Sequence, residues 1–233
     1  MTENNWSQRI LLNITTCPNF SYQYKIREAD RMGERTVACF PEFVGIGERK
    51  KLYLALNHSK ITTVPFVHIR DDFQSWELDY FWNQYQTRYF NVHEGSLVHL
   101  KSWPQKYWPH MYIEFNYNNR IPASLLVNLN KVGGFCLDFS HLWSARDRGV
   151  LEWEVINKLI KKYPVGCNHL NGYSHRRRYD LHYVRSINQL SYLREIPLKY
   201  FGHYLALEMN NSLASQQKYK NYIIGLLNKY SHS

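Results

Sequence analysis

Histidine and carboxylate residues recur at one kind of position in this sequence of 233 residues. Six successive short apolar or β-branched runs each carry one at or near the C-terminal end, namely His68, His93, Glu114, Asp138, His169 and Glu208. Neutral imidazole and carboxylate are the ligands that hold Zn2+, Mn2+ or Fe2+, and a carboxylate can bridge two ions. With about three positions allowed per strand end, chance gives six such residues roughly twice in a thousand sequences. Crowded acids and imidazoles would repel or lose charge without cations, so the pattern predicts a metal centre rather than simple acid–base catalysis.

Three further residues extend this set. His141 follows Asp138 by three positions, and Asp180 and His182 are separated by a single residue. We expect these three to form an additional site, because the loop that holds Asp180 and His182 can fold back over the cluster. Nine candidate ligands are too many for one ion with four to six ligands, so more than one ion is expected.

The elements that position these residues alternate between strands and helices. Eight short, unalternating runs are typical of parallel strands buried on both faces: 9–15, 36–40, 64–69, 89–93, 111–115, 134–138, 165–169 and 203–208. Apolar residues spaced three or four apart predict helices over 48–57, 72–85, 122–130, 151–163, 187–195 and 213–229. Residues 94–110 are expected to be mostly loop, and residues 170–186 a projecting basic loop.

This alternation predicts an α/β protein, a closed (β/α)8 TIM barrel forming one compact domain over residues 1–233. No Gly-x-Gly-x-x-Gly turn follows the first strand, which disfavours an open dinucleotide-binding sheet. In a (β/α)8 barrel the C-terminal ends of the strands converge at one mouth, where the chemistry is built. The predicted fold therefore brings distant ligands together.

Charge and composition bear on partners and location. Lys and Arg number 29 against 19 Asp and Glu, a formal charge of +10, which is suited to a polyanion such as nucleic acid but also compatible with a basic surface that has no such partner. No apolar run is long enough for a membrane span, and the first residues do not form a secretory signal, so we expect a cytoplasmic protein without a membrane partner. The four cysteines form no Cys-x-x-Cys pair and are expected to be reduced structural thiols.

The ordered set of ligands resembles the endonuclease IV family of apurinic/apyrimidinic endonucleases, within the xylose isomerase-like TIM barrels. The resemblance is carried by His68, His93, Glu114, the segment 136–141 (CLDFSH), the segment 169–171 (HLN), Asp180-Leu181-His182 and Glu208. It implies three Zn2+ ions. Of these, the first would be held by His68, His93 and Glu114, the second by Glu114, Asp138, His169 and Glu208, and the third by His141, Asp180 and His182.

The resemblance also implies an activity, which is hydrolysis of the DNA backbone at abasic sites. Glu114, as the carboxylate that bridges two ions, and Glu208, which would orient the attacking hydroxide, are the catalytic residues that it implies. The run Arg176-Arg177-Arg178, next to the third site, is a candidate phosphate-binding segment, with a solvated loop as its alternative. Two or three Zn2+ ions are expected, with Mn2+ or Fe2+ as alternatives, and the protein is expected to be a monomer.

Two other functions fit parts of the pattern. A sugar isomerase or epimerase of the same broad barrel group, acting on a small sugar phosphate, needs only Glu114, Asp138, His169 and Glu208 around one divalent ion. A binding or structural protein that kept the ligands but lost catalysis is the third possibility, because a fold does not fix a function. The four surplus ligands His68, His93, Asp180 and His182 favour the hydrolase.

Overall fold

One large sheet forms the centre of the protein, whose computed structural model describes residues 5–17, 21–118 and 120–230. Every neighbouring pair of strands in this sheet is parallel. The strands are β1 (Ile10–Leu11), β2 (Asn13–Thr15), β3 (Ala38–Phe40), β4 (Phe66–His68), β5 (Tyr89–His93), β6 (Met111–Glu114), β7 (Gly134–Asp138), β8 (Val165–Leu170) and β11 (Tyr204–Leu207).

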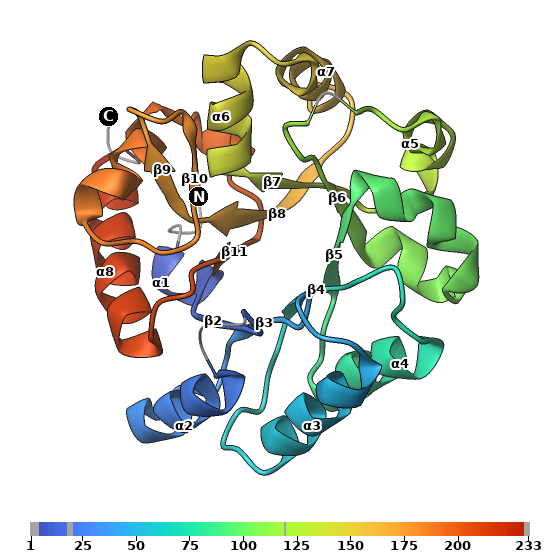
Figure 1. The fold of residues 1–233 in the computed structure, drawn as a ribbon, viewed down its shortest axis with the longest axis vertical. Helices are drawn as coiled ribbons and strands as arrows, with labels where there is room; N and C mark the ends of the chain where they lie inside the picture. The colour runs from blue at the N-terminus through green and yellow to red at the C-terminus, as the bar shows by residue number, and fades with distance from the viewer. Residues whose placement is uncertain (1–4, 18–20, 119, 231–233) are drawn as a thin grey trace.

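The sheet closes on itself through its first strand. The strand order is β1-β11-β8-β7-β6-β5-β4-β3-β2, and only Leu12 separates β1 from β2 in the chain. The two ends of the order are therefore halves of one interrupted strand, and the sheet is a barrel, as Figure 1 shows. This arrangement confirms the predicted (β/α)8 TIM barrel.

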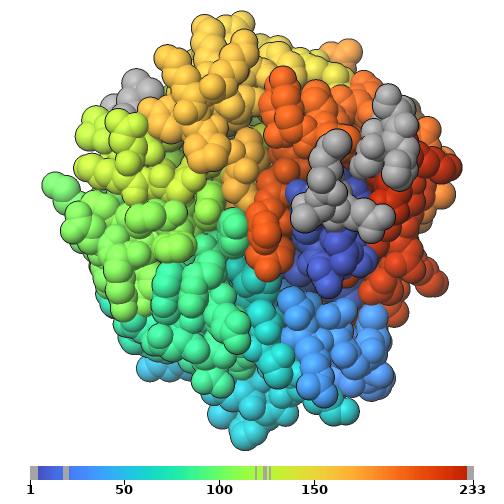
Figure 2. Space-filling model, turned by 180° about the vertical axis from the view of Figure 1, so that it is seen from behind, coloured from blue at the N-terminus to red at the C-terminus, as the bar shows by residue number. Residues whose placement is uncertain are grey.

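Contacts between the start and the end of the chain seal this closure. Gln216, buried in the last helix, accepts a hydrogen bond from the Asn13 backbone N–H at 2.8 Å and donates one to the Asn13 carbonyl at 3.1 Å. From behind, the N-terminal segment (blue) packs against the C-terminal segment (red) in Figure 2. Residues more than 200 positions apart thus supply the backbone hydrogen bonds that the interrupted strand lacks.

Helices surround the barrel (Figure 1). The α-helices are α1 (Trp6–Arg9), α2 (Tyr22–Met32), α3 (Ile46–Asn57), α4 (Ser75–Gln84), α5 (Ala123–Asn128), α6 (Phe139–Arg148), α7 (Leu151–Leu159) and α8 (Leu213–Tyr230). Short 3-10 helices are η1 (Glu94–Ser102), η2 (Gln105–His110), η3 (Leu129–Lys131), η4 (Ile187–Glu195) and η5 (Leu198–Tyr200). None of the helices in the described part of the chain combines the length and apolar character that crossing a membrane requires.

Several predicted elements need correction. Arg9 belongs to helix α1 rather than to the first strand, and residues 187–195 form a 3-10 helix rather than an α-helix. Residues 94–110, expected as loop, are 3-10 turns, and the expected loop 170–186 contains an antiparallel hairpin of β9 (Gly172–Ser174) and β10 (Tyr179–Leu181). Helices α2 and α6 were not predicted. Helix α2 has clear end signals, because the Ser21 side chain caps its start and Gly33, at φ 70°, ends it.

The barrel interior below the mouth is filled with apolar side chains. Alternate residues of the strands point inward and form a separate buried cluster of Leu11, Ala38, Phe40, Phe66, Cys136, Cys167 and Ala206. The three buried cysteines are unpaired, and burial raises the pKa of the Cys39, Cys136 and Cys167 thiols, so they stay protonated. These thiols act as small packing groups.

Candidate metal centre

The period-two alternation of the strands places the candidate ligands at one mouth of the barrel. His68 comes two residues after the inward-facing Phe66, and Glu208 comes two residues after Ala206. Asp138 and His169 follow the lumen cysteines Cys136 and Cys167 in the same way and are paired in register across β7 and β8. Because side chains two residues apart share a face of a strand, each ligand lies one layer above the apolar interior.

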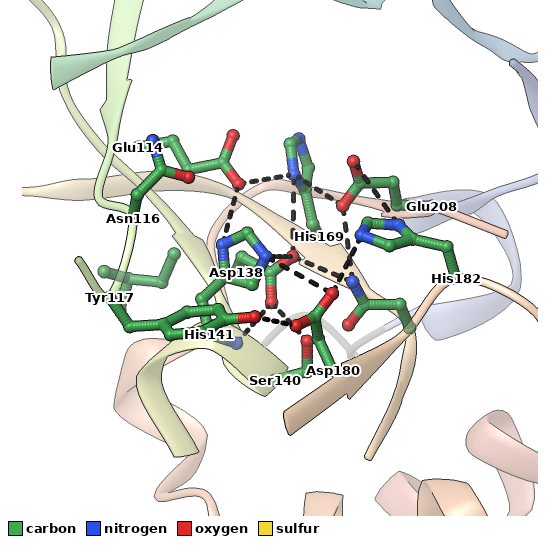
Figure 3. Close-up of polar contacts among 12 residues, drawn as sticks. Glu114, Asn116, Tyr117, Asp138, Ser140, His141, His169, Asp180, His182 and Glu208 are labelled. Atoms are coloured by element: carbon green, nitrogen blue, oxygen red, sulfur yellow. Dashed lines mark hydrogen bonds and ion pairs between the residues drawn. The ribbon is translucent and has the colours of Figure 1, made fainter. Parts of the chain in front are cut away.

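A central group consists of Glu114, Asp138, His169 and Glu208, all of them buried (Figure 3). One ligand atom from each lies within 4.8 Å of the others. His169 Nδ1 is at the centre, 3.3 Å from Glu114 Oε1, 3.2 Å from Glu208 Oε2 and 4.0 Å from Asp138 Oδ2. Three of the side chains lie on β6, β7 and β8, Glu208 follows directly after β11, and all four converge on one small volume.

A second group joins His68 and His93 with Glu42, a residue that the sequence analysis did not select. His68 Nε2 lies 3.6 Å from Glu42 Oε2 and 3.3 Å from Glu114 Oε2. Glu42 follows the lumen residue Phe40 by two positions, which is the same spacing that marks the other ligands. That spacing is the signal that would have found it.

A third group consists of His141, Asp180 and His182. His182 Nε2 lies 2.9 Å from Asp180 Oδ2, and His141 Nε2 lies 3.8 Å from the same oxygen. Helix α6 carries His141, whereas Asp180 belongs to the hairpin strand β10. The hairpin therefore brings Asp180 over the mouth, as was expected of the loop that contains it.

Asp138 connects the fold to the site. Its Oδ1 accepts hydrogen bonds from the His141 backbone N–H and the Ser140 hydroxyl, both at 2.8 Å, and so caps helix α6. Its Oδ2 faces the central group, 4.0 Å from His169 Nδ1. One carboxylate thus starts the helix and still offers an oxygen to the cluster.

Amide and phenol side chains hold carboxylates of the site in place. Asn91 Nδ2 donates to Glu114 Oε2 at 2.7 Å, and Asn171 Nδ2 donates to Asp138 Oδ2 at 3.0 Å. The Tyr117 hydroxyl donates to Asp180 (Figure 3). Partners of this kind fix the direction of a ligand. Asn91 and Tyr117 carry no recognisable sequence signal, because only the folded barrel brings them next to the acids.

Buried nitrogen atoms in the cluster lack hydrogen-bond partners. Among the described residues, none accepts from or donates to either ring nitrogen of His68 and His169, or Nδ1 of His141. Such atoms are costly to bury unless something satisfies them. They lie close to carboxylate oxygens but without hydrogen-bonding geometry, so the lone pairs of imidazoles and acids are available to a shared ion. This donor set fits divalent cations of the Zn2+, Mn2+ or Fe2+ type.

The carboxylates also favour positive charge around them. Burial by itself would lower the pKa of His141, but the charges of Asp138, Glu114 and Asp180 hold it well above its usual value. Burial would likewise raise the pKa of Asp180, yet the nearby imidazoles of His141 and His182, with ring nitrogens 3.8 Å and 2.9 Å from its Oδ2, keep it far below its usual range. Buried clusters of this composition could hold metal ions.

The arginine run lies at the tip of the β9–β10 hairpin. Arg176, Arg177 and Arg178 are all exposed there. The Arg178 guanidinium donates to the Asp147 carbonyl on α6 at 3.3 Å, and its own carbonyl accepts from the Ser144 hydroxyl at 2.6 Å. Arg178 therefore helps to dock the hairpin on α6, which distinguishes it from the other two.

Comparisons with known proteins leave the function of this protein open. No protein-family model matches the sequence, and no curated protein is significantly similar to it. One similar solved structure is an AP endonuclease of family 2 from Brucella melitensis, with 12% identity, 91% of this chain and 98% of that chain covered, and a TM-score of 0.45. Another is a thiamine phosphate pyrophosphorylase from Pyrococcus furiosus, with 13% identity, 94% and 99% covered, and a TM-score of 0.46. Likeness this distant carries no argument about activity, so the case for a function rests on the site.

Proposed function

We propose that this protein is a metal-dependent phosphodiesterase that hydrolyses the DNA backbone at abasic sites. The observation that carries the proposal is the presence of three ligand groups at one mouth, joined by Glu114. Glu114 Oε2 lies 3.3 Å from His68 Nε2, and its Oε1 lies 3.3 Å from His169 Nδ1. A carboxylate whose two oxygens face separate groups is suited to bridging two ions, which a single-ion enzyme does not need.

Two or three Zn2+ ions would be held by the three groups, with Mn2+ or Fe2+ as alternatives. Their ligands would be His68 and His93 with Glu42, then Glu114, Asp138, His169 and Glu208, and finally His141, Asp180 and His182. Bound there, the cations would lower the pKa of a water, polarise the phosphate and stabilise the leaving oxygen.

In this proposal Glu208 orients the attacking water and takes its proton. The carboxylate is buried at the end of β11, with Oε2 3.2 Å from His169 Nδ1 and 3.4 Å from the amide of Asn171. Its second oxygen lies 3.9 Å from His182 Nδ1. Contacts on both oxygens restrict the side chain, so a proton acceptor is held at a fixed place in the mouth.

Charge supports DNA as the substrate. The chain has a formal charge of +10, and the exposed run Arg176 to Arg178 lies on the hairpin that also carries Asp180. Basic side chains beside a phosphate-cleaving centre suit backbone phosphates. We propose that the protein acts in the cytoplasm as a monomer and that an abasic sugar is turned out of the duplex toward the mouth, because a buried cluster cannot reach a stacked nucleotide.

The test is cleavage of a duplex oligonucleotide that holds one abasic site, together with metal analysis of the purified protein. Glu208→Gln is expected to lower the cleavage rate by about 10²- to 10⁴-fold, because it removes the proton acceptor while keeping the shape. The matched control is Glu154→Gln on the exposed side of α7, which should leave the rate unchanged. An unchanged rate in Glu208→Gln, with metal content and fold intact, would refute the role of Glu208.

A single-ion sugar isomerase or epimerase acting on a small sugar phosphate is the second candidate. It is favoured by the central group, whose four buried ligands are complete without the other two groups. One Mn2+ or Co2+ per chain and turnover of a sugar phosphate would support it. Two or three ions per chain with cleavage at the abasic site would support the phosphodiesterase.

A further inference from the structure

A hollow in the surface adjoins the third ligand group. It is lined by two of its members, Asp180 and His182, and by side chains of a different character, chiefly Arg177, Tyr183, Arg185 and Gln189. Arg185, which comes three residues after His182, is not among the residues predicted from the sequence. Two arginine residues therefore line a hollow that is also lined by proposed metal ligands.

The backbone that carries Arg185 is held rigidly. The neighbouring Val184 is buried, and its N–H and carbonyl both pair with the Asn211 side chain, at 2.9 Å and 2.8 Å. The Tyr219 hydroxyl also donates to the Val184 carbonyl at 2.9 Å, and the Arg185 N–H donates to Gln189 Oε1 at 2.7 Å. A side chain on such a base loses less conformational entropy when it binds a ligand.

The guanidinium of Arg185 makes no hydrogen bond or ion pair with any described residue, so its donors are available to a ligand. Arg177 Nη1 donates to the Tyr179 hydroxyl at 2.9 Å, which is the guanidinium's one hydrogen bond with a described residue, and Arg177 is exposed. The three arginines of the run thus differ in position. Arg177 lines the hollow, Arg178 contacts α6, and Arg176 is exposed without lining the hollow.

We propose that Arg177 and Arg185 form a subsite for a phosphate of the nucleic acid that is adjacent to the phosphate being cleaved. Guanidinium groups match phosphate oxygens in charge and geometry. The inference rests on the proposed function, because Asp180 would repel an anion unless its own group held a cation. It also narrows the substrate class, since two phosphates at once require a polynucleotide rather than a small monophosphate.

The test compares three substitutions that each remove one positive charge, Arg177→Ala, Arg185→Ala and the control Arg27→Ala on the exposed side of α2, in cleavage of the abasic duplex by the metal-loaded protein. The first two are expected to raise KM roughly tenfold or more with kcat little changed, because contacts away from the scissile bond bind ground and transition states alike. Each should also reduce the slope of log kcat/KM against log salt concentration by about 0.9. Arg27→Ala should do neither.

A second measurement identifies the phosphate. A series of duplexes is prepared in which one phosphate at a time is replaced by a neutral methylphosphonate. At one position flanking the abasic site, this replacement should lower the cleavage efficiency of the unaltered protein. The same replacement should cause no further loss of cleavage efficiency in Arg177→Ala and Arg185→Ala. Equal effects of all three substitutions, or no effect of any, would overturn the subsite and leave the phosphodiesterase proposal standing.

If the unaltered protein neither binds nor cleaves the abasic duplex, the proposed function fails instead. Calorimetric titration of the metal-loaded protein with inorganic phosphate then decides the subsite. Weaker binding in Arg177→Ala and Arg185→Ala but not in Arg27→Ala would retain a phosphate subsite for a small ligand and exclude a polynucleotide as its ligand. Equal binding in all proteins would overturn the subsite as well.

Discussion

The interior of the barrel and its mouth are built by the same strands, yet they are opposite in character. On β4, β8 and β11 the inward-facing residue changes from Phe66, Cys167 or Ala206 to His68, His169 or Glu208 in one step of two residues. The lower layer is apolar and fully packed, whereas the upper layer collects buried acids and imidazoles. On each of these strands, the inward-facing residue that stabilises the fold and the one that carries the proposed chemistry are therefore only two positions apart.

The lower layer is also tightly restricted by shape. The rings of Tyr89 and Tyr112 stack with centroids 5.0 Å apart, and a Cβ at Gly166 would lie 2.0 Å from the Tyr112 ring. The upper layer instead contains imidazole nitrogens that have no hydrogen-bond partner among the described residues. If the mouth holds cations as we propose, we expect packing to stabilise the interior and bound cations to stabilise the mouth.

The largest effect is expected from removing metal with a chelator. Cleavage at the abasic site should fall by orders of magnitude, and the free energy of unfolding should also fall, because ions that bind only the folded protein stabilise it by about 2.7 kcal/mol at 100 times Kd. Urea unfolding with and without chelator measures the second effect. Readdition of Zn2+ should restore both. Identical unfolding midpoints in the two conditions would contradict the dependence of the mouth on cations.

Substitutions in the two layers should separate stability from metal binding. Phe66→Ala removes a fully buried ring and is expected to cost about 3–5 kcal/mol of unfolding free energy, with the number of ions per folded chain unchanged. His169→Ala should cost less in chelated protein, because neither ring nitrogen has a hydrogen-bond partner among the described residues, but should lower the number of bound ions.

Urea unfolding and metal analysis of the two variants check this contrast. Leu54→Ala, at an exposed position on α3, is the control and should change the unfolding free energy by less than about 0.5 kcal/mol. If Phe66→Ala released metal while His169→Ala did not, the division between the layers would be wrong.

The smallest effect is expected on the pH dependence of the unfolding free energy, through Lys25, a buried residue of α2. Its Nζ donates to Thr15 Oγ1 at 2.6 Å and to the carbonyl of Met209, next to Glu208, at 3.0 Å. Burial lowers the pKa of Lys25 to about 7. The usual pKa of lysine is roughly 10.4, so between pH 7 and that value Lys25 is protonated in the unfolded chain but not in the folded protein. The unfolding free energy therefore rises with pH over this range, by at most about 1.4 kcal/mol per pH unit for this group.

Lys25→Met should remove this contribution. The difference in unfolding free energy between the unaltered protein and the variant, measured with urea at pH 7, 8 and 9, is expected to grow in favour of the unaltered protein. A difference that stays constant over this range would show that Lys25 remains charged in the folded protein. Buried charge would then not be confined to the mouth, because a charged Lys25 on α2 would also need a partner.

The local pattern of the sequence was sufficient for most strands and for nine residues that the structure brings to one mouth. Runs such as 134–138 are buried on both faces, so their apolar composition marks them as strands without tertiary information. The residue at the end of each run is visible in the same pattern. Helix α6 is absent from the prediction because its start overlaps the Asp138 and His141 motif, in which Asp138 is both the helix cap and a proposed ligand.

Tertiary structure alone decided which residues act together. Glu42 reaches His68 and His93, Asn91 reaches Glu114, and Arg185 shares a hollow with Arg177, although none of these pairs is adjacent in the chain. A strand fixes the direction of its side chains through its period of two, which a sequence displays. Distances between side chains on different strands and loops depend on how the barrel closes, and that closure follows from contacts between residues far apart in the sequence.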